Sequence, residues 1–359
     1  MASVREPRRL LLPVAAVAAL LGVIGGIGRS GLLPVPPQVS ISHELLMTVA
    51  VLGSLIALER SGPNSPLLVG PLLIAASGLI SLVPPASPSA GALAAAGSAV
   101  AAASSLRDYG RYGSVALGLI AGGFVALVLS SVLLALGLPV LQVLPLLMCF
   151  PLLVIAGERA ELTASFQRLR PGGPRTAGWR PAVILLLLAV LTSSLSILRH
   201  EVLPAFGAVL TAVGIWLMRG DPAVRAGIGA GGLHRYVAVN TLLGYAWLAA
   251  SGVFHMAAAA LDLPVQIRVH SFYLGFVFHA IVAHAPLILP ALAGIRRPVF
   301  TGWLYASTLL LTPSLALRFA GILMGLLAAY KLGVALNAVS IAALAIALVS
   351  KALQVRAPT

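Results

Sequence analysis

Long apolar runs separated by short polar breaks extend along the whole chain. Runs near 20 residues recur between breaks made of Pro, Gly and clustered charges. A run of this length crosses the roughly 30 Å hydrocarbon core of a bilayer as an α-helix. The breaks divide the chain into twelve predicted spans, at residues 10–28, 41–60, 66–83, 89–107, 113–137, 139–160, 180–198, 202–219, 233–260, 266–291, 299–323 and 333–352. The third, fourth and eighth of these spans are expected to be short. The pattern predicts an all-α, polytopic integral membrane protein with a single transmembrane domain over residues 1–359.

Composition agrees with this fold class. The chain is 60% hydrophobic and only 9% charged, and its mean hydropathy is +1.04. Soluble domains carry about 25% charged residues. The first 28 residues resemble a signal peptide, but no small-x-small cleavage site precedes Arg29, so we expect an uncleaved first span.

The net charge of +14 indicates membrane topology rather than a nucleic-acid partner. With the N-terminus inside, eighteen of the 23 Lys and Arg residues fall on the inner side and five on the outer side. Cytoplasmic loops carry such an excess of cations. We therefore expect both termini inside, the lipid bilayer as the main partner, and no nucleic acid.

A short motif recurs at the inner ends of two spans. Span 2 ends in "SLIALERSG" and span 6 in "LLVIAGERAE", which place Glu59 and Glu158 in the same Ile-Ala-x-Glu-Arg pattern. Span 10 carries His284 at the same depth. Because these spans are four apart, the pattern predicts three pseudo-repeated four-helix units, over about 10–107, 113–219 and 233–352.

The outer ends of the same three spans extend the comparison. His43 and Gln142 each lie sixteen residues before the motif glutamate, and His270 lies fourteen before His284. Neutral imidazole is the commonest metal ligand and a frequent axial ligand of haem iron. His43 and His270 are therefore candidate ligands on the two faces of one haem. A structural role or proton handling stays open for both.

The remaining histidines differ in depth. His200 and His234 flank arginine-rich loops and are expected to make ordinary hydrogen bonds. His255 lies within a span, where a structural role and a metal-binding role are equally open. In a continuous α-helix His279 would face away from His270, and His284 would lie roughly 21 Å from it along the axis. A second metal near His279 or His255 is therefore a separate hypothesis.

The motif glutamates allow two interpretations. A Glu-Arg pair at an inner helix end is often a boundary marker whose arginine reaches the lipid phosphates. The alternative is a transporter or channel in which Glu59, Glu158, His279 and His284 line a polar proton or substrate pathway.

No signature of a soluble enzyme is present. There is no Walker loop, CxxC or HExxH, and the glycine clusters lack the strand and helix of a dinucleotide site. The single cysteine, Cys149, can form no internal disulfide. Whether the protein is an enzyme stays undecided.

Two of the predicted spans resemble a known family. "SHELLMTVAVLGSLIALER" and "HSFYLGFVFHAIVAHAPLILP" are similar to the corresponding helices of the NnrS family, over about 40 residues, and the twelve-span architecture resembles haem-copper oxidase subunit I. NnrS-type proteins are haem- and copper-containing bacterial membrane proteins linked to nitric-oxide stress.

The resemblance implies a protein of the bacterial cytoplasmic membrane that binds haem b through His43 and His270, with copper as a second metal. It implies electron transfer with a redox partner or quinol, or the binding of a small gas such as nitric oxide. The oxidases also need a histidine and a tyrosine on span 6, where this chain has Gln142 and Cys149, and a His-His pair on span 7, whose interior has no histidine. Because this chain departs from the oxidases at these positions, we expect no oxygen-reducing centre.

Overall fold

The computed structural model describes residues 6–61, 66–83, 86–169, 178–292 and 298–356, and the regular structure of these residues is entirely helical. Contacts divide the chain into two compact units. The first unit comprises Met1–Glu161 and Val190–His200, and the second comprises Leu162–Ala189 and Glu201–Thr359. Some of the arginines that indicate orientation lie outside the described residues, namely Arg5, Arg170, Arg175, Arg296 and Arg297.

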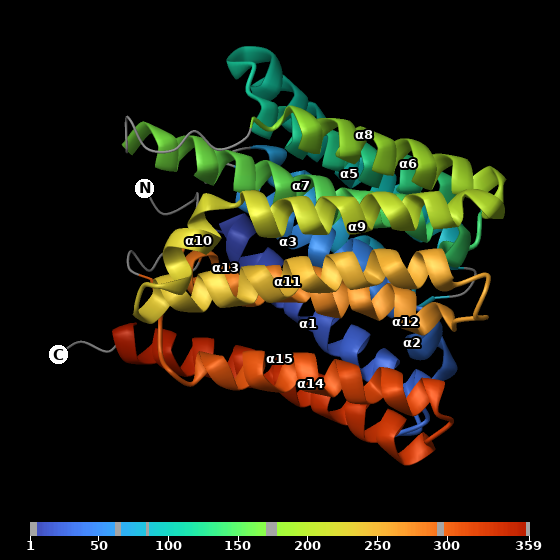
Figure 1. Ribbon diagram of the computed structural model, residues 1–359. Helices are drawn as coiled ribbons and strands as arrows, with labels where there is room; N and C mark the ends of the chain where they lie inside the picture. The colour runs from blue at the N-terminus through green and yellow to red at the C-terminus, as the bar shows by residue number, and fades with distance from the viewer. Residues whose placement is uncertain (1–5, 62–65, 84–85, 170–177, 293–297, 357–359) are drawn as a thin grey trace. The chain divides into compact units, whose positions relative to one another are not determined.

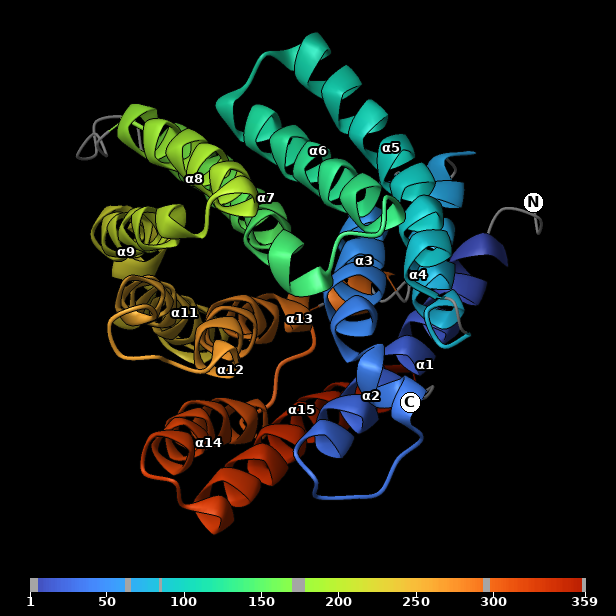
Figure 2. The same ribbon diagram turned by 90° about the vertical axis from the view of Figure 1, so that its right-hand side faces the viewer.

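The first unit is built from the N-terminal helices (Figure 1). They are α1 (Glu6–Arg29), α2 (Pro37–Ile41), the π-helix η1 (Leu45–Val51), α3 (Leu52–Arg60), the 3₁₀ turn η2 (Pro66–Leu68), α4 (Val69–Ile80), α5 (Ala86–Tyr112), α6 (Val115–Ala135), most of α7 (Val140–Leu169) and the second half of α8 (Arg180–Leu198). Helix α1 packs on η1 and α4, and α5 packs along α6, beside which it lies in Figure 2. Helix α6 begins where Ser114 accepts a bond from the Leu117 amide at 3.2 Å, which caps its first turn.

The second unit follows, with the 3₁₀ turn η3 (His200–Val202) at the boundary. It contains α9 (Leu203–Gly220), α10 (Pro222–Ile228), α11 (Gly232–Ala257), α12 (Val265–His270), the π-helix η4 (Ser271–Val277), α13 (Phe278–Leu292), α14 (Leu304–Leu323) and α15 (Leu327–Arg356). The short helix α10 has no counterpart among the predicted spans. Asp221 caps it through the Ala223 amide at 2.9 Å, and the Tyr245 hydroxyl donates to the same carboxylate at 2.8 Å.

Glycines bring the helices of this unit into backbone contact. Helices α9 and α11 lie side by side in Figure 2, and a Cβ added at Gly207 or Gly252 would collide with the carbonyl oxygen of the other. Small residues at membrane helix interfaces allow this approach, because packing rather than the hydrophobic effect holds helices together in lipid.

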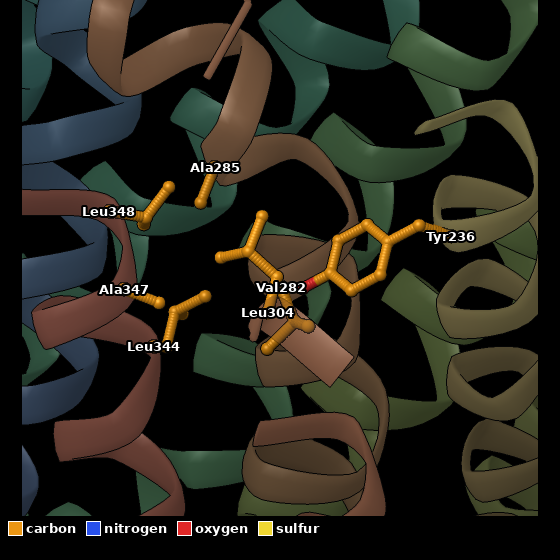
Figure 3. Close-up of a cluster of buried hydrophobic side chains, with 7 residues drawn as sticks. All are labelled: Tyr236, Val282, Ala285, Leu304, Leu344, Ala347 and Leu348. Atoms are coloured by element: carbon orange, nitrogen blue, oxygen red, sulfur yellow. The ribbon is translucent and has the colours of Figure 1, made fainter. Parts of the chain in front are cut away.

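An apolar cluster joins four helices of the second unit (Figure 3). Its buried members are Tyr236, Val282, Ala285, Leu304, Leu344, Ala347 and Leu348, from α11, α13, α14 and α15. The Tyr236 ring packs edge-on against Tyr305, with centroids 5.0 Å apart.

Ten helices among the described residues have the length and apolar composition to cross a membrane. They confirm a multi-pass helical membrane protein, whereas the count of twelve spans stays a prediction. The expected second span is divided between η1 and α3, and the third contains the 3₁₀ turn η2 followed by the 12-residue helix α4. The fourth span is longer than expected, because Pro88–Tyr112 is 25 residues long, whereas α9, in the eighth span, has only 18 residues.

Candidate functional site

His43 and His270 both stand at the start of a π-helical segment. His43 lies two residues before η1, and His270 is the residue that caps η4. π-Helical turns are rare and frequently occur at functional sites. The offsets expected between His270 and the later histidines assumed a continuous α-helix. This assumption is wrong, because η4 separates His270 from His279 and its wider turn contains more residues.

His43 packs on the glycine face of α1 in the first unit. Its Nδ1–H donates to the Gly22 carbonyl oxygen at 2.6 Å. A Cβ added at Gly26 would lie 2.8 Å from the imidazole Cε1, so a side chain there would force the ring to shift. Because a carbonyl can only accept, the neutral imidazole has its lone pair on Nε2. The next residue, Glu44, forms an ion pair with Arg29 at the end of α1.

His270 occupies the end of α12 in the second unit and is partly buried. Its Nδ1–H donates to the Gln266 carbonyl oxygen at 2.8 Å, which again leaves the lone pair on Nε2.

The two histidines fit the chemistry of axial haem ligation. A ligating imidazole usually donates its other nitrogen to a carbonyl or carboxylate, which fixes the tautomer and the ring orientation. Other helical histidines of this chain make the same bond to a carbonyl four residues earlier. That bond alone therefore does not single out His270; its position at the π-helix does.

His255 and His279 are held by hydrogen bonds and ring contacts inside the second unit. His255 is 3% exposed, donates to the Ser251 carbonyl oxygen at 2.8 Å and packs edge-on against Phe206. His279 donates from Nδ1 to the Gly275 carbonyl oxygen at 2.7 Å, and its Nε2 accepts from the Thr312 hydroxyl at 3.1 Å. Both nitrogens of His279 are therefore already engaged. A metal-binding role for either histidine stays a prediction.

Gln142, Cys149 and His284, which the sequence analysis also considered, make hydrogen bonds within a helix or between two helices. Gln142 donates to the Ile197 carbonyl oxygen at 2.9 Å and so joins α7 to the second half of α8. Cys149 is buried beside the Ser193 hydroxyl at 3.2 Å on the same two helices. His284, in α13, is partly buried and bonds to the Ala280 carbonyl oxygen at 2.8 Å.

The two copies of the Ile-Ala-x-Glu-Arg motif meet in the first unit. Arg60 of the first copy forms ion pairs with Glu158 of the second copy at 3.3 Å and with Glu161, one turn further along α7, at 3.2 Å. Glu59 interacts electrostatically with these same three residues. The glutamates therefore belong to one network of charges that joins α3 to α7.

Arg159, the arginine of the second copy of the motif, lies in a different environment from Arg60. Arg159 is 2% exposed, whereas the Arg60 side chain is 23% exposed. Equivalent positions of the predicted repeat therefore differ in burial.

Sequence reasoning missed Glu161, Gln266, Arg318 and Tyr330, although one signal was present. Arg318 lies inside the predicted span 299–323, and an ionisable residue within a span is a functional candidate by default.

Among the described residues, no group of three or more His, Cys, Asp or Glu side chains is arranged to hold a metal ion.

The observed features define a class: a multi-pass helical membrane protein with a histidine at a π-helical segment in each unit and a charged network in the first. The chain belongs to the family described as Domain of unknown function (DUF8744), whose model matches residues 8–353. No curated protein and no solved structure matches the chain.

Proposed function

We propose that this protein binds haem b through His43 and His270 in a bacterial cytoplasmic membrane. The observation that carries the proposal is that each histidine stands where an α-helix changes to a π-helix, with its lone pair on Nε2. Nε2 is an atom through which imidazole ligates iron.

The bound haem would supply a one-electron redox centre. His43 and His270 would hold the haem, whose one-electron chemistry would serve electron transfer with a quinol or protein partner, or the binding of a small gas such as nitric oxide. The Gly22 and Gln266 carbonyl bonds raise the basicity of the two imidazoles and hold their orientation.

Absorption spectroscopy of the protein purified in detergent tests the proposal. We expect a Soret band, identified as haem b by the pyridine haemochrome. The band should be lost or strongly reduced in His43→Ala and His270→Ala. The exposed His200 and His234 offer matched controls, and His200→Ala and His234→Ala should retain the band.

Two further results sharpen this test. Because His43 also fills space against α1, His43→Gly should be assayed with added imidazole, which restores the Soret band if the side chain acts as a ligand. A colourless native protein, or a band unchanged in both His43→Ala and His270→Ala, would overturn the proposal.

A transporter or channel is the alternative, and the network of Arg60 with Glu158 and Glu161 favours it. Partly buried charges near a span end can form a gate for protons or ions. This alternative predicts a colourless protein whose ion flux in proteoliposomes is lost in Glu158→Gln.

A further inference from the structure

Arg318 of α14 is a buried cation whose described partners are neutral. Its residue is 6% exposed. Its Nη2 donates to Gln266 Oε1 at 3.4 Å, and its guanidinium carbon lies 5.8 Å from the centre of the Tyr330 ring. Its Nε is buried and has no hydrogen-bond partner among the described residues.

No described carboxylate forms an ion pair with Arg318. The second unit holds only three acidic residues, Glu201, Asp221 and Asp262, and Asp221 is engaged with Tyr245 and the start of α10. Burial of a charge without an opposite charge is strongly unfavourable, so a buried guanidinium usually pairs with an anion. An anionic group of a ligand would therefore balance the charge of the Arg318 guanidinium.

Gln266 connects this cation to the proposed haem ligand. Its backbone oxygen accepts the His270 Nδ1–H at 2.8 Å, while its side-chain Oε1 accepts from Arg318 and from the Tyr330 hydroxyl at 3.2 Å. His270, Arg318 and Tyr330 therefore surround one residue of α12.

Close packing of α14 on α15 fixes the backbone at Arg318 and at Tyr330. A Cβ added at Gly333 of α15 would lie 2.6 Å from the Arg318 amide nitrogen, and Gly321 of α14 approaches Tyr330 in the same way. Arg318 and Tyr330 are thus held at the contact between α14 and α15, and a ligand would not have to order their backbones.

We propose that Arg318, assisted by the Tyr330 hydroxyl, binds a propionate carboxylate of the haem that His270 ligates. This inference rests on the proposed function. A guanidinium binds a carboxylate through two parallel hydrogen bonds, which are stronger than its long bond to the neutral Gln266 amide. The carboxylate would supply the negative charge that the described neighbours of Arg318 lack.

Reconstitution with two porphyrins tests this assignment. Protein produced in haem-deficient cells is titrated in detergent with haem b or with its dimethyl ester, in which both propionates are neutral. In the native protein we expect esterification to weaken binding by about tenfold or more, the size typical for loss of a charged hydrogen bond. Arg318→Gln should bind haem b, with its free propionates, about tenfold more weakly than the native protein does. Esterification should not weaken binding to this variant further.

Matched variants separate charge recognition from folding. Arg199→Gln changes an exposed arginine and should keep the full difference between acid and ester. Arg318→Lys should keep part of it, and Tyr330→Phe should reduce it without removing the cation. If Arg318→Gln does not fold, as judged by gel filtration and thermal unfolding, these two variants carry the test.

The failures of the two proposals are distinguishable. A native protein that binds neither porphyrin overturns haem binding and the Arg318 assignment together. Equal ester effects in native protein, Arg318→Gln and Arg318→Lys overturn only the assignment. The assignment also fails if acid and ester bind native protein equally while phosphate or chloride raises the melting temperature only when Arg318 is present, because the site then takes a free anion.

Discussion

Arg60 and Glu158 come from two copies of one sequence motif and pair with each other at 3.3 Å across α3 and α7. Their side chains are 23% and 18% exposed. The pair is thus shielded from water more than a surface ion pair, whose contribution is typically below about 1 kcal/mol.

A double-mutant cycle on this pair should reveal coupling. We expect Arg60→Gln to lower the free energy of unfolding by about 1–3 kcal/mol, because it leaves Glu158 and Glu161 without their shared cation. Glu158→Gln should cost less, since Glu161 still balances Arg60. The double variant should be less destabilised than the sum, by at least about 0.5 kcal/mol. Reversible denaturation in mixed micelles measures these values, and additive effects would show that the two residues act independently.

Gly26 controls the position of the His43 ring. Gly26→Leu would place a side chain where the imidazole lies, since even a Cβ would be 2.8 Å from Cε1. We expect haem content, measured as Soret absorbance per protein, to fall by more than half while helicity by circular dichroism is kept. Gly110→Leu is the matched control, because a Cβ at Gly110 meets no described atom within 4 Å. Equal haem content in the two variants would contradict the expectation.

His279 should matter for stability rather than for colour. Its Nε2 accepts from Thr312, whose oxygen in turn accepts the Trp247 Nε1–H at 3.2 Å. His279→Ala should reduce the free energy of unfolding by about 1–3 kcal/mol, the cost of leaving buried polar groups unpaired, and should shift Trp247 fluorescence. Thr312→Val should have a similar effect. If His279→Ala instead removes a bound metal at unchanged stability, the metal-binding prediction is correct.

Gly252 should tolerate no side chain. A Cβ there would overlap Thr211 and the Gly207 carbonyl oxygen of α9. Gly252→Ala is expected to force α9 and α11 apart and to cost about 1–3 kcal/mol or more. Gly229→Ala provides a control, because a Cβ at Gly229 meets no described atom within 4 Å. Thermal unfolding in detergent compares the two, and similar melting temperatures would contradict the close packing of α9 on α11.

The helical, multi-pass character of the protein followed from the apolar pattern. In lipid the backbone of a spanning segment must satisfy its own hydrogen bonds, so an apolar run of sufficient length becomes a helix regardless of its neighbours. The ends of the apolar runs also placed His43 and His270 at one end of their spans. They placed the motif glutamates Glu59 and Glu158 at the other end of theirs. The apolar pattern failed on the length of the fourth span, because the charged and glycine residues of 108–112, which the pattern marks as a break, continue the helix to Tyr112.

Other features depend on residues distant in sequence, and the apolar pattern could not reveal them. Neither the change to π-helix after His270 nor the meeting of Arg60 with Glu158 is visible in the period of apolar positions. The sequence places Arg318 only within the predicted span 299–323, whereas the tertiary structure buries it beside Gln266 of α12 and Tyr330 of α15. The reason is physical: a helix forms from bonds within its own segment, whereas ion pairs, buried charges and ligand sites form only between helices packed together in three dimensions.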